Sequence, residues 1–241
     1  MKKIAIFTEG QTELIFVRTL LKMLKAYSKL SFECFKLNAG SLAKKPYSFS
    51  CPDPQLHFMI IDVHNDETVL TAIRDREKGL IEKGFYEIVG LRDLYSEAYE
   101  KRSRGVISEP VSNELIKSHK TVIKQMNYPN KIKLYYSIME IEAWFLAMYN
   151  LFQKINSKLT VAFINQHLKV DLQSIDPQKF FFRPSKEIVR IYSLCGFDYD
   201  KSEHCIESLC SKIDRSDFLS ATTNGRCSSL SSFYRQIENY S

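Results

Sequence analysis

Residues 4–13 read IAIFTEGQTE, and this stretch decides the fold. The apolar run stops at Glu9-Gly10, which predicts a short buried strand followed by a tight turn. From Thr12 onward, apolar side chains recur at helical spacing. Glu13 stands in the first turn of this helix, where the helix dipole favours an acid. Strand, turn and helix in this order are the beginning of a βα unit.

The alternation of strand and helix continues along the chain. Further strands are expected at 57–63, 86–91 and 131–138, with an extra one at 31–37. Helices are expected between residues 66 and 84 and over 112–126, and loops over 38–54 and 95–110. Strands that alternate with helices form βαβ units, so the pattern predicts an α/β fold with a mainly parallel sheet flanked by helices.

The pattern becomes helical from about residue 145, with breaks at 176–177, 183–184 and 224–225. Apolar residues recur there at helical spacing and need a face to cover. We therefore expect two domains, an α/β domain over 1–149 and a helical C-terminal subdomain over 150–241.

Composition places the chain among ordinary globular proteins, with 44% hydrophobic and 26% charged residues. No apolar run is long enough to span a membrane, and the apolar start is too short for a signal peptide, so we expect a cytoplasmic protein without membrane contact. The six cysteines lack a CxxC pair and are expected to be free thiols. The net charge of +6 is spread along the chain; it permits a nucleic-acid partner without requiring one.

Acidic residues follow three of the expected strands. Glu9 follows the first, Asp93 the third, and Glu140 or Glu142 the fourth, while Glu13 lies one helical turn after Glu9. Ligands of open α/β sheets bind outside the carboxyl ends of the strands. Carboxylates that converge there repel one another unless a cation joins them, and hard oxygen ligands select Mg²⁺ or Mn²⁺. The alternative is that each acid is a solvated loop residue.

These segments resemble a known family. Residues 4–13 are similar to the hhhxEGxTE opening of toprim-like proteins, in which h is hydrophobic and x is any residue. VGLRD at 89–93 and MEIEAW at 139–144 follow in the order seen in a toprim-like family of uncharacterised bacterial proteins, which is related to the OLD-type nucleases of anti-phage defence. The resemblance covers residues 3–148 and, more loosely, 183–186 and 229–234.

The resemblance implies a toprim-like sheet and assigns roles to the acids. Glu9 would be a metal ligand or the general acid/base, Asp93 would be the first acid of a DxD motif that binds Mg²⁺, and Glu142 would be the fourth-strand acid, with Glu140 as the alternative. These are the expected catalytic residues, and Glu13 is a further expected metal ligand. Gly10 is expected to allow a tight turn close to the site.

One position departs from the family pattern. The second acid of the DxD motif is replaced by Tyr95, a poor ligand for Mg²⁺. Glu97 is an alternative ligand two residues further along. The change leaves one-metal chemistry or a degenerate site as alternatives to two-metal cleavage.

A basic tract follows Asp93. Lys101, Arg102 and Arg104 are expected on a loop, either as a phosphate clamp for substrate or as ordinary solvated side chains. Asp62, His64, Asp66 and Glu67 follow the second strand, where helix capping is favoured over metal binding. Trp144 is expected to pack in the core rather than to stack on a base.

The resulting expectation is a metal-dependent nuclease that cleaves nucleic-acid phosphodiesters as the effector of an anti-phage or toxin-like system. The alternative is a degenerate module that binds nucleic acid or an ATPase encoded by a neighbouring gene. A phosphatase would share the acidic site. The choice between DNA and RNA, and the oligomeric state, stay open.

Overall fold

The computed structural model describes residues 1–25, 28–64 and 68–240, and within this part the chain has an α/β fold with a mixed, mostly parallel sheet. The strands of the sheet are β1 (Lys2–Thr8), β2 (Leu30–Asn38), β3 (Ser41–Lys44), β4 (Phe49–Ser50), β5 (Leu56–Asp62), β6 (Phe85–Asp93) and β7 (Ile132–Ser137). The first four helices are α1 (Gln11–Lys25), α2 (Thr68–Glu82), α3 (Glu97–Ser103) and α4 (Glu109–Lys124), followed by the 3-10 turn η1 (Pro129–Lys131).

After β7 the described chain is helical. The elements are α5 (Glu142–Ala147), α6 (Leu151–Ile155), α7 (Val161–Leu168), α8 (Pro177–Phe180), α9 (Pro184–Ser193), α10 (Glu203–Ser211), α11 (Arg215–Thr222), the 3-10 turn η2 (Thr223–Gly225) and α12 (Ser228–Glu238). The expected α/β fold with helical C-terminal elements is confirmed, and the arrangement is consistent with a toprim-like, Rossmann-type fold. No helix of the described part is long and apolar enough to cross a membrane.

The sheet has the strand order β3-β2-β5-β1-β6-β7. β1 pairs in parallel with β5 and β6, so that Thr8 is opposite Asp62 on one side and Leu91 on the other. Two short strands, β3 and β4, pair antiparallel with β2. The expected loop over 38–54 is therefore wrong, because this segment folds back on β2 and extends the edge of the sheet.

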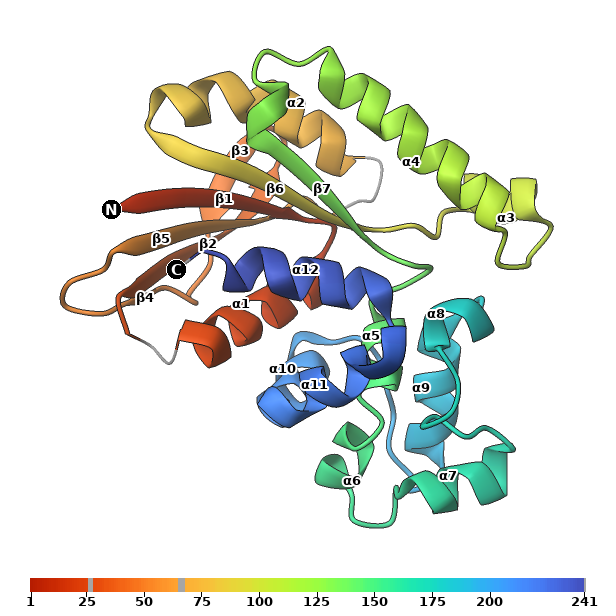
Figure 1. Cartoon of the computed structure of the whole chain (residues 1–241). Helices are drawn as coiled ribbons and strands as arrows, with labels where there is room; N and C mark the ends of the chain where they lie inside the picture. The colour runs from red at the N-terminus through yellow and green to blue at the C-terminus, as the bar shows by residue number, and fades with distance from the viewer. Residues whose placement is uncertain (26–27, 65–67, 241) are drawn as a thin grey trace. The chain divides into compact units, whose positions relative to one another are not determined.

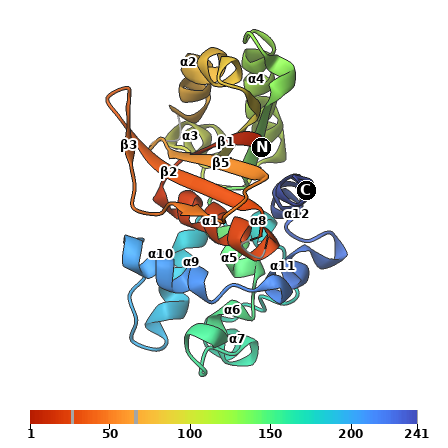
Figure 2. The ribbon, with the colours of Figure 1, turned by 90° about the vertical axis from the view of Figure 1, so that its left-hand side faces the viewer.

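The central position of β1 explains its continuous apolar sequence. Residues 4–7 are fully buried because helices cover both faces of the sheet. Figure 1 shows α2 and α4 over one face and α1 over the opposite face, and the view in Figure 2 agrees. Ala5 and Phe7 belong to the core cluster under α2 and α4, together with Ile73 of α2 and Ile123 of α4.

Chain contacts divide the described residues into two compact units that are interleaved along the sequence. Unit 1 contains residues 1–92, 108–136 and Tyr240, and unit 2 contains 93–107 and 137–239. The expected domain boundary between residues 149 and 150 falls inside unit 2. Within unit 2, the fully buried α5 packs against α8, α9 and α11, so the helical elements form a folded unit rather than a flexible tail.

The expected loop over 95–110 is also wrong. Residues 97–103 form α3, whose N-cap Ser96 accepts a hydrogen bond from the backbone N–H of Tyr99. Lys101 and Arg102 consequently lie in the last turn of a helix, and Arg104 is its C-cap. Asp66 and Glu67, for which helix capping after the second strand was expected, lie outside the described residues.

Candidate functional site

The turn after β7 has a strained backbone and is followed by two acids of unit 2. Met139 is fully buried and has a φ of +67°, a left-handed conformation that costs a bulky residue about 1–2 kcal/mol. Its carbonyl oxygen accepts a hydrogen bond of 2.9 Å from the N–H of Tyr95, which fixes the turn. Glu140 follows in the turn, and Glu142 begins α5. Strained backbone of this kind is concentrated at functional sites.

Glu142 is fully buried, and only one of its two carboxylate oxygens has hydrogen-bond partners among the described residues. Its Oε1 lies 2.8 Å from the Nζ of Lys201 and 3.0 Å from the hydroxyl of Tyr199, which donates to it. Its Oε2 is buried and has no hydrogen-bond partner among the described residues. Burial and the nearby carboxylate of Glu142 raise the pKa of Tyr199 well above its usual value, so the phenol stays a donor.

Lys201 carries the positive charge next to Glu142. Partial burial would lower the pKa of its ammonium group, but Glu142, Glu140 and Asp93 together raise that pKa above the usual lysine value. The ammonium group therefore stands in the electrostatic field of all three carboxylates. Lys201 has a φ of +57°, and its side chain is 44% exposed. No sequence motif pointed to this residue.

Glu140 is held by the beginning of α9. Its Oε2 accepts a hydrogen bond of 2.7 Å from the backbone N–H of Ser185, in the first turn of that helix. Pro184 occupies the first helical position, where a missing N–H costs nothing, and the helix dipole favours a carboxylate. The sequence of residues 183–186 thus has a local role, since it presents a helix N-terminus to Glu140.

Asp93 ends β6 and is partly exposed. Its Oδ1 accepts a hydrogen bond from the hydroxyl of Ser137, which is itself fully buried at the end of β7. Asp93, Glu140 and Glu142 are therefore each positioned by a separate donor from unit 2, and all three act on the same lysine.

Tyr95, at the position where the resemblance predicts the second acid of a DxD motif, contacts Glu100 of α3. Its hydroxyl donates to Oε2 of Glu100 at 2.9 Å, and the same oxygen lies 2.6 Å from Nη2 of Arg183. The Arg183 guanidinium stands 4.5 Å over the Tyr95 ring. Hydrogen bonds from Arg183 and Tyr95 lower the pKa of Glu100. Glu100 is thus the acid that Tyr95 contacts, and Glu97 begins α3 as an exposed residue.

Glu9 and Glu13 lie in unit 1, at the carboxyl end of β1. The N–H of Glu9 donates to the carbonyl of Leu91 at 3.1 Å and extends the pairing of β1 with β6. Glu13 is buried in the first turn of α1. Gly10 lies in the turn between β1 and α1 without a left-handed φ, and a Cβ there would meet Oε2 of Glu13 at 3.2 Å; its role in bringing the backbone close to the site stays a prediction. A share of Glu9 and Glu13 in a metal site stays a prediction.

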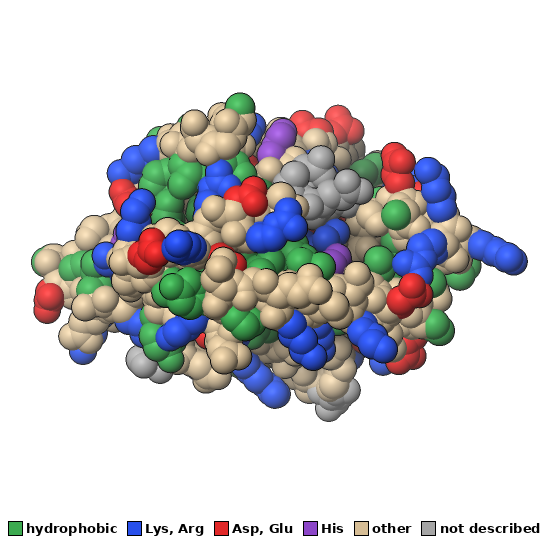
Figure 3. Space-filling model, turned by 90° about the horizontal axis from the view of Figure 1, so that it is seen from above, with side chains coloured by type: hydrophobic (Ala, Val, Ile, Leu, Met, Phe, Trp, Pro, Cys, Tyr) green, Lys and Arg blue, Asp and Glu red, His purple; other side chains and the backbone are tan. Residues whose placement is uncertain are grey.

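The expected phosphate-binding residues are solvent-exposed. Lys101, Arg102 and Arg104 lie in unit 2, at the end of α3. On the face that carries α2 and α4, acidic and basic side chains are interspersed rather than gathered in one patch (Figure 3). A role of the three residues in binding substrate stays a prediction.

Trp144 packs in the core, as expected. It is fully buried, stacks on Phe233 with ring centroids 5.8 Å apart, and donates its indole N–H to the hydroxyl of Ser229 at 2.8 Å. Ser229 in turn donates to the side-chain oxygen of Gln178. The segment 229–234 therefore has a structural function, which is to hold Trp144.

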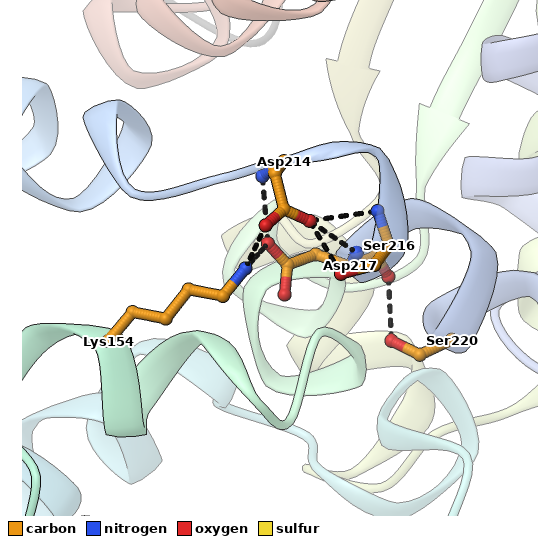
Figure 4. A network of polar contacts seen from close by, with 5 residues as sticks. All are labelled: Lys154, Asp214, Ser216, Asp217 and Ser220. Atoms are coloured by element: carbon orange, nitrogen blue, oxygen red, sulfur yellow. Dashed lines mark hydrogen bonds and ion pairs between the residues drawn. The ribbon is translucent and has the colours of Figure 1, made fainter.

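A second polar network joins α6 to the start of α11 (Figure 4). Nζ of Lys154 lies 2.7 Å from a carboxylate oxygen of each of Asp214 and Asp217, and Asp217 is fully buried. The hydrogen bond from Lys154 helps to lower the pKa of Asp214 to about 2. Asp214 and Asp217 also form a capping box for α11, so both acids are engaged in holding unit 2 together.

The donor set of unit 2 suits a hard divalent cation. Asp93, Glu140 and Glu142 offer carboxylate oxygens, which Mg²⁺ and Mn²⁺ prefer, and Oε2 of Glu142 is a buried acceptor without a donor. No group of three or more His, Cys, Asp or Glu side chains in the described part has an arrangement that could hold a metal ion. Carboxylates are the ligand type that Mg²⁺ prefers, but the arrangement of these acids does not form a metal site, and Lys201 supplies the positive charge next to Glu142.

Comparisons with protein-family models, with curated proteins and with solved structures found no match for this chain. The functional argument therefore rests on the residues and geometry of the site.

Proposed function

We propose that this protein is a metal-dependent nuclease that cleaves phosphodiester bonds of DNA or RNA. The observation that carries the proposal is the fully buried carboxylate of Glu142, whose Oε1 pairs with Lys201 and whose Oε2 has no hydrogen-bond partner among the described residues, with Glu140 and Asp93 adding to the raised pKa of Lys201. Three carboxylates near one another are costly unless a cation compensates them. A cluster of this composition is suited to Mg²⁺ or Mn²⁺, which keeps sites open for phosphate oxygens.

The bound ion would polarise the phosphate and lower the pKa of a bound water. The chain's own residues would hold it: Asp93, oriented by Ser137; Glu140, oriented by the first turn of α9; and Glu142, oriented by Tyr199. The family resemblance also implies that Glu9 and Glu13 would be metal ligands. Glu9 would then act as an acid/base or ligand.

The proposal also covers the residues that bind the substrate and the biological system in which the protein acts. Lys101, Arg102 and Arg104 would contact phosphates of the nucleic acid, which positions a substrate without reading its sequence. By the same resemblance the protein would act in the cytoplasm, as the effector of an anti-phage or toxin-like system, with an ATPase encoded by a neighbouring gene as a partner.

The test is a cleavage assay with labelled single- and double-stranded DNA and RNA in Mg²⁺ or Mn²⁺. We expect cleavage that Asp93→Asn and Glu9→Gln each reduce at least 100-fold, because both changes keep the side-chain shape and remove the charge. Asp198→Asn, an exposed acid of unit 2, is the matched control and should cleave like the wild type. Cleavage that survives Asp93→Asn unchanged would contradict the assignment.

The second candidate function is a non-catalytic module that binds nucleic acid or the partner ATPase. The engagement of Tyr95 with Glu100 and Arg183 favours it, because the position of the second DxD acid then has a structural task. In this case the wild type binds nucleic acid without cutting it. Tyr95→Asp discriminates between the two functions: a gain of cleavage supports a degenerate nuclease site.

A further inference from the structure

The beginnings of three neighbouring strands carry lysines at one edge of unit 1. β1 begins at Lys2, β6 at Phe85 and β7 at Ile132, and the parallel pairing of β1 with β6 places Lys3 opposite Phe85. The start of β1 is marked N in Figure 1. The lysines at these strand beginnings, called the basic edge below, are Lys2, Lys3, Lys83, Lys131 and Lys133.

Two lysines of the basic edge are held against one exposed ring. The Nζ atoms of Lys2 and Lys131 lie 4.4 and 4.7 Å from the ring centre of Tyr86, which is 50% exposed. Because an aromatic ring attracts ammonium groups through its quadrupole, Tyr86 fixes both side chains at the surface. The two distances leave the ammonium groups no more than 9.1 Å apart.

The charges of these two lysines lack a counter-ion from the chain itself. Within the part of the chain that the structure describes, neither Lys2 nor Lys131 forms an ion pair with a carboxylate. The neighbouring acid, Glu87, is buried; one of its oxygens lies 3.0 Å from Nζ of Lys133, and the other accepts a hydrogen bond from the Tyr240 hydroxyl. Like charges so close together repel each other, and a bound anion would compensate them. The basic edge therefore indicates an anionic ligand.

We propose that the basic edge binds the phosphate backbone of nucleic acid, with Lys2 and Lys131 as the central contacts and Tyr86 as the residue that positions them. The inference rests on the proposed function for the identity of the anion, since a nuclease meets nucleic acid as its substrate. It adds a binding surface in unit 1 to the residues of α3 that were expected to bind phosphate.

The composition of the edge fits nucleic acid better than other anions. Several ammonium groups along one edge match a polymer that carries a phosphate on each nucleotide, whereas a small anion would meet only one or two of them. The exposed part of the Tyr86 ring offers a surface on which a base can stack, which favours nucleic acid over an acidic peptide or a lipid headgroup. Phosphate contacts of this kind hold a strand without reading its sequence.

The experiment measures the affinity for a fluorescent single-stranded oligonucleotide by anisotropy, with EDTA present so that no metal-dependent cleavage occurs. The double variant Lys2→Gln/Lys131→Gln should bind at least 10-fold more weakly than the wild type. Its affinity should also depend less on salt, with a slope of log K against log salt that is shallower by about one to two units. The matched control is Lys78→Gln/Lys120→Gln, which removes two exposed lysines of unit 1 from α2 and α4 and should bind like the wild type.

Equal affinity of the wild type and Lys2→Gln/Lys131→Gln would overturn the proposal, as would an equal loss in the control variant. A wild type that binds vesicles of anionic lipid and not the oligonucleotide would also overturn it.

Variants of Tyr86 separate its positioning role from the charge of the lysines. Tyr86→Ala keeps all the ammonium groups and removes the ring that holds two of them, so we expect it to weaken binding several-fold. Tyr86→Phe keeps the ring and should bind like the wild type. Affinity of Tyr86→Ala equal to that of the wild type would contradict the role of the ring.

A further measurement uses the wild type and so does not depend on the folding of a variant. Acetylation of individual lysines is followed by mass spectrometry with and without the oligonucleotide. We expect the oligonucleotide to protect Lys2 and Lys131 several-fold and to leave Lys78 and Lys120 unchanged. Unchanged reactivity of Lys2 and Lys131 at saturating oligonucleotide would contradict the proposal.

Binding and cleavage are measured separately, so the two proposals fail separately. Binding that depends on Lys2 and Lys131, in a protein that cleaves nothing when Mg²⁺ or Mn²⁺ is added, supports the basic edge and contradicts the nuclease. Cleavage by the wild type together with full affinity of Lys2→Gln/Lys131→Gln supports the nuclease and contradicts the basic edge. A protein that neither binds nor cleaves nucleic acid contradicts both.

Discussion

The hydroxyl of Tyr199 and the ammonium group of Lys201, two residues apart in sequence, meet at one carboxylate oxygen, Oε1 of Glu142, at 3.0 and 2.8 Å. One short segment thus supplies both the neutral and the charged donor to a fully buried acid. Because a buried acceptor is costly when it loses a donor, the position of Glu142 depends on this segment.

Removal of the Tyr199 hydroxyl should therefore destabilise the protein. Tyr199→Phe leaves the buried oxygen of Glu142 with one donor fewer, and we expect a loss of about 1–3 kcal/mol in the free energy of unfolding. Tyr192→Phe is the matched control, since Tyr192 is a buried tyrosine that packs edge-on against the Tyr199 ring. Chemical denaturation measures both. A loss in Tyr192→Phe as large as that in Tyr199→Phe would show that packing, rather than the hydrogen bond, is responsible.

The side chains packed around Gly90, in the middle of β6, leave no room for a Cβ. A Cβ at this position would lie 2.5 Å from Cδ1 of Leu134 and 3.0 Å from Cδ1 of Ile73, so Gly90→Ala should cost about 1–3 kcal/mol through overpacking. Gly79 offers the opposite case inside α2, where a Cβ would meet nothing within 4 Å. Gly79→Ala should therefore stabilise the protein by about 0.5–1 kcal/mol. Melting temperatures that move in the same direction for both variants would contradict this packing.

His119 should remain neutral in mildly acidic solution. Burial, aided by the charge of Arg92, lowers its pKa from 6.5 to about 4 in the folded protein. As pH falls, the unfolded chain takes up this proton first, so the stability that depends on neutral His119 is present above pH 6.5 and is lost between 6.5 and 4. An NMR titration of the imidazole measures the pKa, and a midpoint above 6 would contradict the structure. His119→Gln should make stability less dependent on pH within this window.

Trp144, the only tryptophan, makes unit 2 observable by fluorescence. Because its ring is fully buried, emission should be blue-shifted in the native protein and move to the red on unfolding. Ser229→Ala removes the acceptor of the indole N–H and the donor to Gln178, and should cost about 1–3 kcal/mol. Ser232→Ala, an exposed serine on the same helix, is the control and should change stability little. Red-shifted emission from the native wild type would contradict the burial of Trp144.

The central strands and α1 could be predicted from sequence because their signals are local. Residues 4–7 form a continuous apolar run, and burial on both faces of a parallel sheet demands one. β3 and β4 were missed because their pairing with β2 is set by contacts far apart in sequence, and their few residues are largely exposed. α3 was missed because only Tyr99 and Ser103 of its seven residues are buried, which leaves little hydrophobic pattern.

The acids of the candidate site could be named from sequence, whereas their partners could not. Asp93, Glu140 and Glu142 follow strands, and strand ends can be located from apolar runs. Lys201 contacts Glu142 across 58 intervening positions, and a single lysine between two helices carries no motif. Ser185 and Ser229 lie in tail segments with a family resemblance, but only the structure shows that they bind Glu140 and Trp144.

The most direct test of the account is to locate the metal. Crystals of the wild-type protein grown or soaked with Mn²⁺ allow the ion to be identified by its anomalous diffraction. The account predicts an anomalous peak within about 2.0–2.4 Å of carboxylate oxygens from Asp93 and from Glu140 or Glu142. Well-ordered carboxylates with no peak beside them at millimolar Mn²⁺ would contradict it.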